Sequence, residues 1–247
     1  MRTLRILLIS VMILGVLFVG ADRVTVRLAQ DKVASKMKTA ENLASTPEVS
    51  IKGFPFLTQL ASGGLDDVEF DIKDYEADTN NGGNDERSSI RIDDLKAQIK
   101  DVMFADDYSS ATVSSASGTA TIAYDELLKA AKSHPTQILT GVTAQVVSLS
   151  DGGNGKIRAA IKFHSPLGTQ TYAVLNTITV DGNEVKVRAD NLPKLVAGLG
   201  SARAHSITDF HQSIDQLPTG MKLDSVRATK DGLKITVKGS NVNLAEL

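Results

Sequence analysis

The chain contains no cysteine and no tryptophan, and aromatic residues make up only 4% of its 247 positions. Without cysteine, disulfide bonds and thiolate chemistry are excluded. An excess of one charge sign is also lacking, because 27 basic and 29 acidic residues give a formal charge of −2. The sequence contains no block of like charges that would indicate a nucleic-acid partner. With 42% hydrophobic and 23% charged residues, the composition is that of an ordinary globular protein.

Recognisable catalytic and metal-binding motifs are missing as well. The sequence has no GxSxG elbow, no HExxH motif, no complete P-loop and no dinucleotide fingerprint. His205 and His211 would point about 240° apart on a helix, away from a shared metal. Adjacent acidic residues such as Asp66 and Asp67 face opposite sides of a strand and make a poor acid/base pair. We therefore expect no catalytic residue, no metal site and no cofactor, with an unrecognised hydrolase as a residual possibility.

The longest uncharged run lies at the N-terminus, where Arg2 and Arg5 precede the apolar residues 6–21. A basic segment before such a run is typical of an export signal. Small residues at positions 19–21 (VGA) suit signal-peptidase cleavage, and sixteen residues is slightly short for an uncleaved membrane anchor. Cleavage is the favoured interpretation, and an anchor formed by residues 6–21 is the alternative.

Both interpretations place the chain after residue 21 outside the cytoplasm. We predict an exported protein that is secreted, lies in a periplasm-like space of the cell envelope, or is held at the membrane. No clean linker divides residues 22–247, so we expect a signal peptide or anchor at residues 1–21 followed by a single domain.

Periodicity predicts one long helix followed by strands. Between Asp22 and Ser45, apolar residues recur at steps of three and four, which indicates an amphipathic helix lying on a sheet. The alternative, a helix lying on a membrane surface, fits its mixed charges less well. Strict alternation from Val68 to Ile72 indicates a half-buried strand. Shorter helices are expected at residues 124–132 and 202–214.

The C-terminal half repeats a hairpin pattern three times, over residues 142–163, 171–189 and 223–237. Each pair of alternating runs is joined by a turn that contains Asp-Gly, which is a strong hairpin signal because these positions favour positive φ. The predicted fold class is therefore α+β, with a meandering antiparallel sheet and a long N-terminal helix.

Two of the seven phenylalanines lie two positions apart around a proline. They belong to residues 49–60, VSIKGFPFLTQL, which are followed by a turn of small residues and a strand. This stretch resembles the signature of the LmeA-like phospholipid-binding proteins. The resemblance continues through residues 118–127, where a strand leads into Tyr124 and Leu127. It returns at residues 217–239, LPTGMKLDSVRATKDGLKITVKG, and so covers nearly all of the exported part.

The resemblance implies a fold similar to the tubular lipid-binding (TULIP) proteins, in which a strongly curved antiparallel sheet wraps a long helix and leaves an elongated apolar cavity. It also implies phospholipid binding in a bacterial cell envelope, without known catalysis. Simple energetics is compatible with such a function, since burying sixteen methylenes contributes roughly 13 kcal/mol before ordering costs. A polar site is not required for affinity.

We expect apolar side chains of the helix and first strands to line the cavity: Val33, Met37, Phe54, Phe56, Leu57, Leu60, Val68, Phe70 and Ile72. Any of them could instead fill one end of a solid core. Lys52 could meet a lipid phosphate at the mouth, although an exposed lysine is usually only solvated. The expected partners are phospholipid or another acyl lipid and a membrane surface. The main alternative function is an envelope module with a filled core that binds a protein partner.

Overall fold

The computed structural model describes residues 2–78, 89–105, 110–130, 135–190, 210–213, 217 and 219–245. The elements are α1 (Arg2–Ala40), β1 (Glu48–Lys52), α2 (Phe56–Ala61), β2 (Gly64–Asp78), β3 (Ser89–Phe104), β4 (Ser110–Ile122), α3 (Tyr124–Ala130), β5 (Thr136–Leu139), β6 (Val142–Asp151), β7 (Ile157–Ser165), β8 (Gly168–Asp181), β9 (Glu184–Ala189), β10 (Phe210–Ser213), β11 (Met221–Thr229) and β12 (Gly232–Ala245). The predicted α+β class, with a long N-terminal helix and a strongly curled antiparallel sheet, is confirmed.

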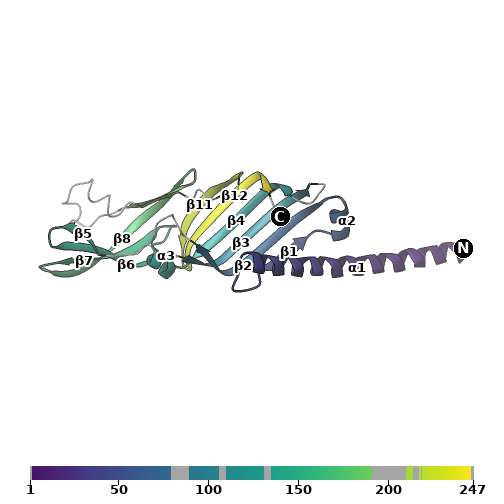
Figure 1. Ribbon diagram of the computed structural model, residues 1–247, viewed down its shortest axis with the longest axis horizontal. Coiled ribbons are helices and arrows are strands. Elements are labelled where there is room, and N and C mark those ends of the chain that lie inside the picture. The colour runs from purple at the N-terminus through teal and green to yellow at the C-terminus, as the bar shows by residue number, and fades with distance from the viewer. Residues whose placement is uncertain are drawn as a thin grey trace.

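Two six-stranded antiparallel sheets follow one another along the long axis of the molecule (Figure 1). Sheet A has the strand order β1-β2-β3-β4-β12-β11, and sheet B has the order β10-β9-β8-β7-β6-β5. The last strand, β12, thus returns to pair with β4, and β11 pairs with β12 at the edge of the sheet. Early and late parts of the chain therefore both contribute to sheet A. Sheet B is built entirely from the residues between α3 and β11.

The three predicted hairpins are confirmed as β6-β7, β8-β9 and β11-β12. Their turns hold the glycines that the sequence pattern required. Gly182 has a φ of +62°, and Gly232 has a φ of +150°. A Cβ on Gly232 would lie 2.2 Å from the carbonyl oxygen of Ile122, so the neighbouring strand leaves no room for a side chain there.

The helix α1 is one continuous element of 39 residues. It joins the segment predicted as a signal or anchor to the helix predicted over Asp22–Ser45. Its first half projects from the body at the end where α2 lies (Figure 1). The helix is long and apolar enough to cross a membrane, and an 18-residue stretch of it has a mean hydropathy of 2.1. The helix ends at Ala40, five residues before the predicted end at Ser45. Just after it, Asn42 adopts the left-handed backbone conformation that often terminates a helix, with a φ of +49°.

Three apolar clusters hold the described part of the molecule together. The first packs α1 and α2 against sheet A and contains Val26, Phe56 and Val113. The second lies within sheet B. The third combines Leu223 and Val226 of sheet A with residues of β8 and β9, so it joins the two sheets.

The curl of sheet A is accompanied by a change in which side chains face inward. Val102 and Ile99 are three residues apart on β3, yet both pack into the first cluster. Asp101 lies between them, and the regular pairing is interrupted there. The interruption continues at the same level on the adjacent strands β2, β4 and β12, and we call this row of four residues the crease: Asp66, Asp101, Ser114 and Asn241. Asp101 and Asn241 have φ of +51° and +53°, a conformation that Asp and Asn tolerate better than most residues.

Of the two shorter helices predicted from the sequence, one is confirmed, and the other is wrong over the part of it that the structure describes. α3 covers Tyr124–Ala130 of the helix predicted at residues 124–132, and the last two predicted positions lie outside the described residues. The helix predicted over residues 202–214 is contradicted at Phe210–Ser213, which form β10 and pair with β9. Pairing to an open strand edge satisfies the same backbone groups that a helix would satisfy internally. The rest of that segment lies outside the described residues.

That residues 22–247 form a single domain remains a prediction, and Leu223 offers a test. Its side chain is 6% exposed in the cluster that joins the sheets, so Leu223→Ala should cost about 2–5 kcal/mol of unfolding free energy. In a single domain, peptides from both sheets lose hydrogen-exchange protection together. Loss confined to sheet A would indicate two independent units.

Candidate functional site

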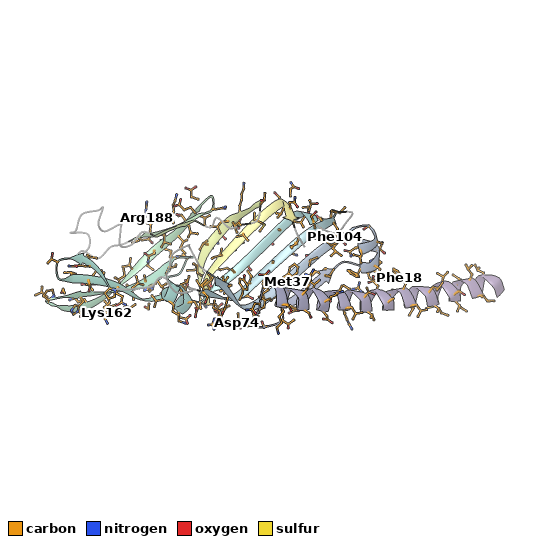
Figure 2. All side chains as sticks on the ribbon, viewed as in Figure 1. Phe18, Met37, Asp74, Phe104, Lys162 and Arg188 are labelled. Atoms are coloured by element: carbon orange, nitrogen blue, oxygen red, sulfur yellow. The ribbon has the colours of Figure 1, made fainter. Side chains whose placement is uncertain are left out.

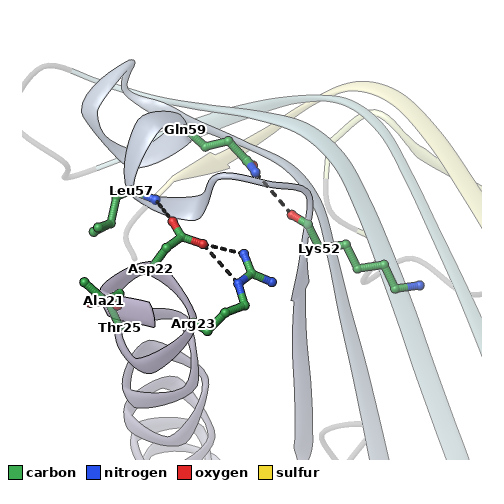
Figure 3. Close-up of polar contacts among 7 residues, drawn as sticks. All are labelled: Ala21, Asp22, Arg23, Thr25, Lys52, Leu57 and Gln59. Carbon is green, nitrogen blue, oxygen red and sulfur yellow. Dashed lines mark hydrogen bonds and ion pairs between the residues drawn. The ribbon is translucent and has the colours of Figure 1, made fainter. Parts of the chain in front are cut away.

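The Phe-Pro-Phe stretch contains the short helix α2, which α1 holds in place (Figure 3). The residue before α2 is Pro55, which offers no side-chain oxygen to cap the free amides of the first turn. Asp22 of α1 replaces that cap, because its Oδ1 accepts a hydrogen bond of 2.8 Å from the Leu57 N–H. The other oxygen, Oδ2, accepts hydrogen bonds from Arg23, with 3.1 Å to Nε. The Asp22 side chain is fully buried.

The Asp22 carboxyl is held in its charged form. Burial raises its pKa, but the hydrogen bond from the Leu57 N–H and the hydrogen bonds and charge of Arg23 outweigh burial and leave the pKa below its ordinary value. A group with a lowered folded-state pKa stabilises the protein above its unfolded pKa of about 3.9. That contribution is lost as the pH falls through the lower, folded-state pKa.

On its other side, α2 is fastened to the ends of β1 and β2 by Gln59. Its Oε1 accepts a hydrogen bond of 2.8 Å from the Asp66 N–H, and its Nε2 lies 3.5 Å from the Lys52 carbonyl oxygen. Gly53 makes this approach possible, since a Cβ there would lie 2.3 Å from Gln59 Nε2. Together, Asp22 and Gln59 fix α2 across the end of sheet A.

The two rings around Pro55 have opposite surroundings. Phe56 is 3% exposed and lies in the first cluster, whereas Phe54 is 58% exposed. The guanidinium carbon of Arg23 lies 5.1 Å from the centroid of the Phe54 ring, within the range of a cation–π contact. Leu57 packs partly against the cluster, while Leu60 is 37% exposed. The Phe-Pro-Phe stretch therefore seals the core with one ring and exposes the other.

The remaining predicted lining residues are also divided. Val68 is buried in the first cluster, and Met37 and Phe70 pack against it (Figure 2 labels Met37). Ile72 is buried outside that cluster. Val33 is 37% exposed, although it follows Val26 by seven residues, about two helical turns, and so lies on the same side of α1. Whether these residues line a lipid cavity remains a prediction.

The register of sheet A identifies the inward-facing residues beyond β2, which the sequence pattern alone did not indicate. One inner row crosses all six strands of sheet A, and the row beside it lies nearer sheet B. The first row is Val49, Phe70, Ala97, Gly118, Val237 and Leu223, and the second is Ile72, Leu95, Ala120, Ile235 and Val226. The alternation of Ala116, Gly118 and Ala120 in β4 was a visible signal, but its partners depended on long-range pairing.

The middle of these rows is made of small residues that are only half-buried. Ala97, Gly118 and Ala120 belong to none of the three apolar clusters. They lie between the bulkier residues that pack under α1 and α2 and those that pack against sheet B. We call this stretch of the inner face, centred on these three residues and Leu95, the trough.

The opposite face of sheet A is charged and largely self-paired. A hollow of about 370 Å³ lies on it, with Glu48, Asp71 and Lys96 in its lining. The Lys96 ammonium lies 3.3 Å from Asp71, which faces it across the strands. This hollow is mixed in polarity and is not the apolar cavity that the resemblance implied, which therefore remains an expectation.

The lysine considered as a phosphate ligand has a protein partner. The Lys52 ammonium pairs with the Glu69 carboxylate, which raises the pKa of Lys52. For metal chemistry, the described residues contain no group of three or more His, Asp or Glu side chains arranged to hold an ion.

A model of the LmeA-like phospholipid-binding family matches residues 20–238, nearly the whole chain. The chain therefore belongs to this family, and the resemblance read from its sequence is confirmed. The family is a lipid-binding one rather than a known enzyme family. No curated protein and no solved structure matches the chain.

The opposite surroundings of the two rings predict opposite effects on stability. Phe56→Ala should lower the unfolding free energy by about 3–5 kcal/mol, because it leaves a cavity in the first cluster. Phe54→Ala serves as the matched control and should change it by no more than about 0.5 kcal/mol. Urea unfolding monitored by circular dichroism measures both, and equal losses would contradict the assignment of one ring to the core.

The lowered pKa of Asp22 predicts a specific pH dependence. Asp22→Asn retains an oxygen that can accept from the Leu57 N–H but removes the titrating group. The wild-type urea midpoint should therefore fall more steeply than that of the variant as the pH drops from about 5 to about 2. Parallel midpoint curves would show that the Asp22 charge does not stabilise the fold.

Proposed function

We propose that this member of the LmeA-like family acts outside the cytoplasm, where it shelters the acyl chains of a phospholipid on the apolar inner face of sheet A. Its role would be to carry or present lipid during assembly of the cell envelope. The family match supports lipid binding. The place on the molecule is inferred from the inner rows.

The observation that carries the proposal is the trough. Apolar side chains in a fully packed core are normally buried, whereas those of Leu95, Ala97 and Ala120 are only half-buried. Val33 adds to this pattern, because it lies on the sheet-facing side of α1 and still has more than a third of its surface exposed. An acyl chain laid along the small residues of β4, from Ala116 to Ala120, would have about 13 Å of strand to contact.

The binding free energy does not require a charged side chain in the trough. Each methylene removed from water contributes about 0.8 kcal/mol, so ten of them contribute roughly 8 kcal/mol before ordering costs. The head group would then remain at the open side, in contact with water or a membrane. This division suits the structure, since sheet A presents small apolar residues on one face and paired charges on the other.

We also propose that residues 6–21 remain attached as a membrane anchor. Proteases favour exposed, flexible chain segments, whereas the bond after Ala21 lies within a continuous helix. The Thr25 hydroxyl donates a hydrogen bond of 2.9 Å to the Ala21 carbonyl oxygen. The next residue, Asp22, is fully buried beside α2. These contacts favour the anchor over the cleaved signal peptide.

The competing function is an envelope module with a solid core that binds a protein through its surface. The tight packing of Phe56 and Val68 under α1 favours this alternative at the α2 end of sheet A. The two functions differ at the trough, which would be filled by lipid in one case and would have no ligand in the other.

Filling the trough should therefore weaken lipid retention. In Ala120→Phe the ring would displace about three methylenes, a loss of about 2.4 kcal/mol or roughly 50-fold in affinity. Thr121→Phe is the matched control, because the next residue on the strand faces the opposite side. Native mass spectrometry of the full chain, released from detergent micelles, measures the fraction that retains phospholipid.

We expect retained phospholipid in the wild type and in Thr121→Phe, with a large decrease in Ala120→Phe. A wild-type chain without phospholipid, or equal retention in the two variants, would contradict binding in the trough. The first of these results would favour the protein-binding module.

A further inference from the structure

Three exposed apolar side chains lie on or beside α2 at the end of sheet A. Phe54, which is 58% exposed, directly precedes α2, and Leu60, which is 37% exposed, lies within it. Met103 is 56% exposed and pairs in register with Gly64, three residues after α2 ends. We call these three side chains the rim. Their position is notable because the other large side chains near α2, such as Phe56, turn into the core.

The rim lies at the end of the body from which the apolar half of α1 emerges (Figure 1). Phe18, on the projecting part of α1, is 44% exposed, and Leu17 is 63% exposed (Figure 2 labels Phe18). The apolar residues 6–21 form about 24 Å of helix, slightly less than the roughly 30 Å hydrocarbon core of a bilayer, and Arg2 and Arg5 lie just before this segment. A bilayer crossed by this segment would thus end close to Asp22.

Asp22 fixes the distance between the end of that segment and the rim. Its carboxylate binds the Leu57 amide, so the first residue after the apolar run lies in direct contact with α2. The next residue, Arg23, places its guanidinium over the Phe54 ring. An aromatic ring beside an arginine is a combination suited to the membrane interface, where the ring meets the acyl boundary and the cation meets phosphate.

We propose that the rim is a second membrane contact, which rests in the interface of the bilayer that α1 spans. Two contacts hold the body in a defined orientation, with α2 against the lipid and sheet B farthest from it. The occupant is a lipid surface rather than a protein, because the apolar helix brings the bilayer to this end of the molecule. This inference rests on the anchor of the proposed function, but it does not require that the trough binds lipid.

The absence of tryptophan from the chain permits a direct test. Single tryptophans are introduced as Phe54→Trp, as Leu167→Trp and as Phe18→Trp. Leu167, the control, is 100% exposed in the turn between β7 and β8 of sheet B. The full chain is reconstituted in nanodiscs of phosphatidylcholine and phosphatidylglycerol, with or without bromine atoms on the acyl chains, and tryptophan fluorescence is recorded.

We expect brominated lipid to quench Phe54→Trp and Phe18→Trp at least two-fold, and to leave Leu167→Trp unchanged. Quenching of Phe18→Trp without quenching of Phe54→Trp would overturn the rim as a membrane contact while leaving the anchor intact. Absence of quenching at both positions would show that α1 does not span the bilayer, and would overturn the rim together with the anchor. Lipid retention in the trough is measured separately and is unaffected by either result.

Discussion

The hydrogen bond between the buried Asp22 carboxylate and the Leu57 amide determines how the rest of the structure is placed. It links the point where the apolar run ends to the short helix that closes the end of sheet A. This contact fixes how α1 is rotated about its axis and where it lies along that axis relative to sheet A, and it thereby places Val26 and Ala34 in the first cluster. A local sequence rule would have placed the cap of α2 at Pro55, which offers no acceptor. The chain instead supplies the acceptor from a helix 35 residues earlier.

Features set by local chemistry could be predicted from the sequence. The hairpins follow from turns in which Asp-Gly permits positive φ, and α3 follows from a short helical pattern after a strand. The halves of α1 were recognised separately, but their continuity was missed, since a signal sequence and a core helix are usually distinct elements. The strand β10 was predicted as part of a helix because Ile207, Phe210 and Ile214 recur in the sequence at steps of three and four. Only its pairing with β9 decides between them.

Features set by long-range pairing could not be predicted in the same way. The environments of Phe54 and Phe56 depend on α2, a helix that the sequence pattern did not indicate, and on the arrival of α1 beside it. Likewise, the position of Ala97 beside Gly118 depends on β3 pairing with β4, and that of Gly118 beside Val237 on β4 pairing with β12. These partners are far apart in the chain, so the candidate trough became visible only with the register. The family resemblance indicated the ligand class and a lining on the helix and first strands, but it did not indicate the rows that continue beyond β2.

The crease restricts how the lengths of four strands can change. Its residues, Asp66, Asp101, Ser114 and Asn241, lie opposite one another, and each allows its strand to turn the following side chains to the same face as those of its neighbours. A one-residue insertion or deletion in a single strand would move its crease residue out of this row. The apolar side chains beyond it would then point to the charged face of the sheet. Variation in chain length among proteins of this fold should therefore collect in the connections between strands, while the distance from each strand's crease residue to its inward-facing partners stays constant.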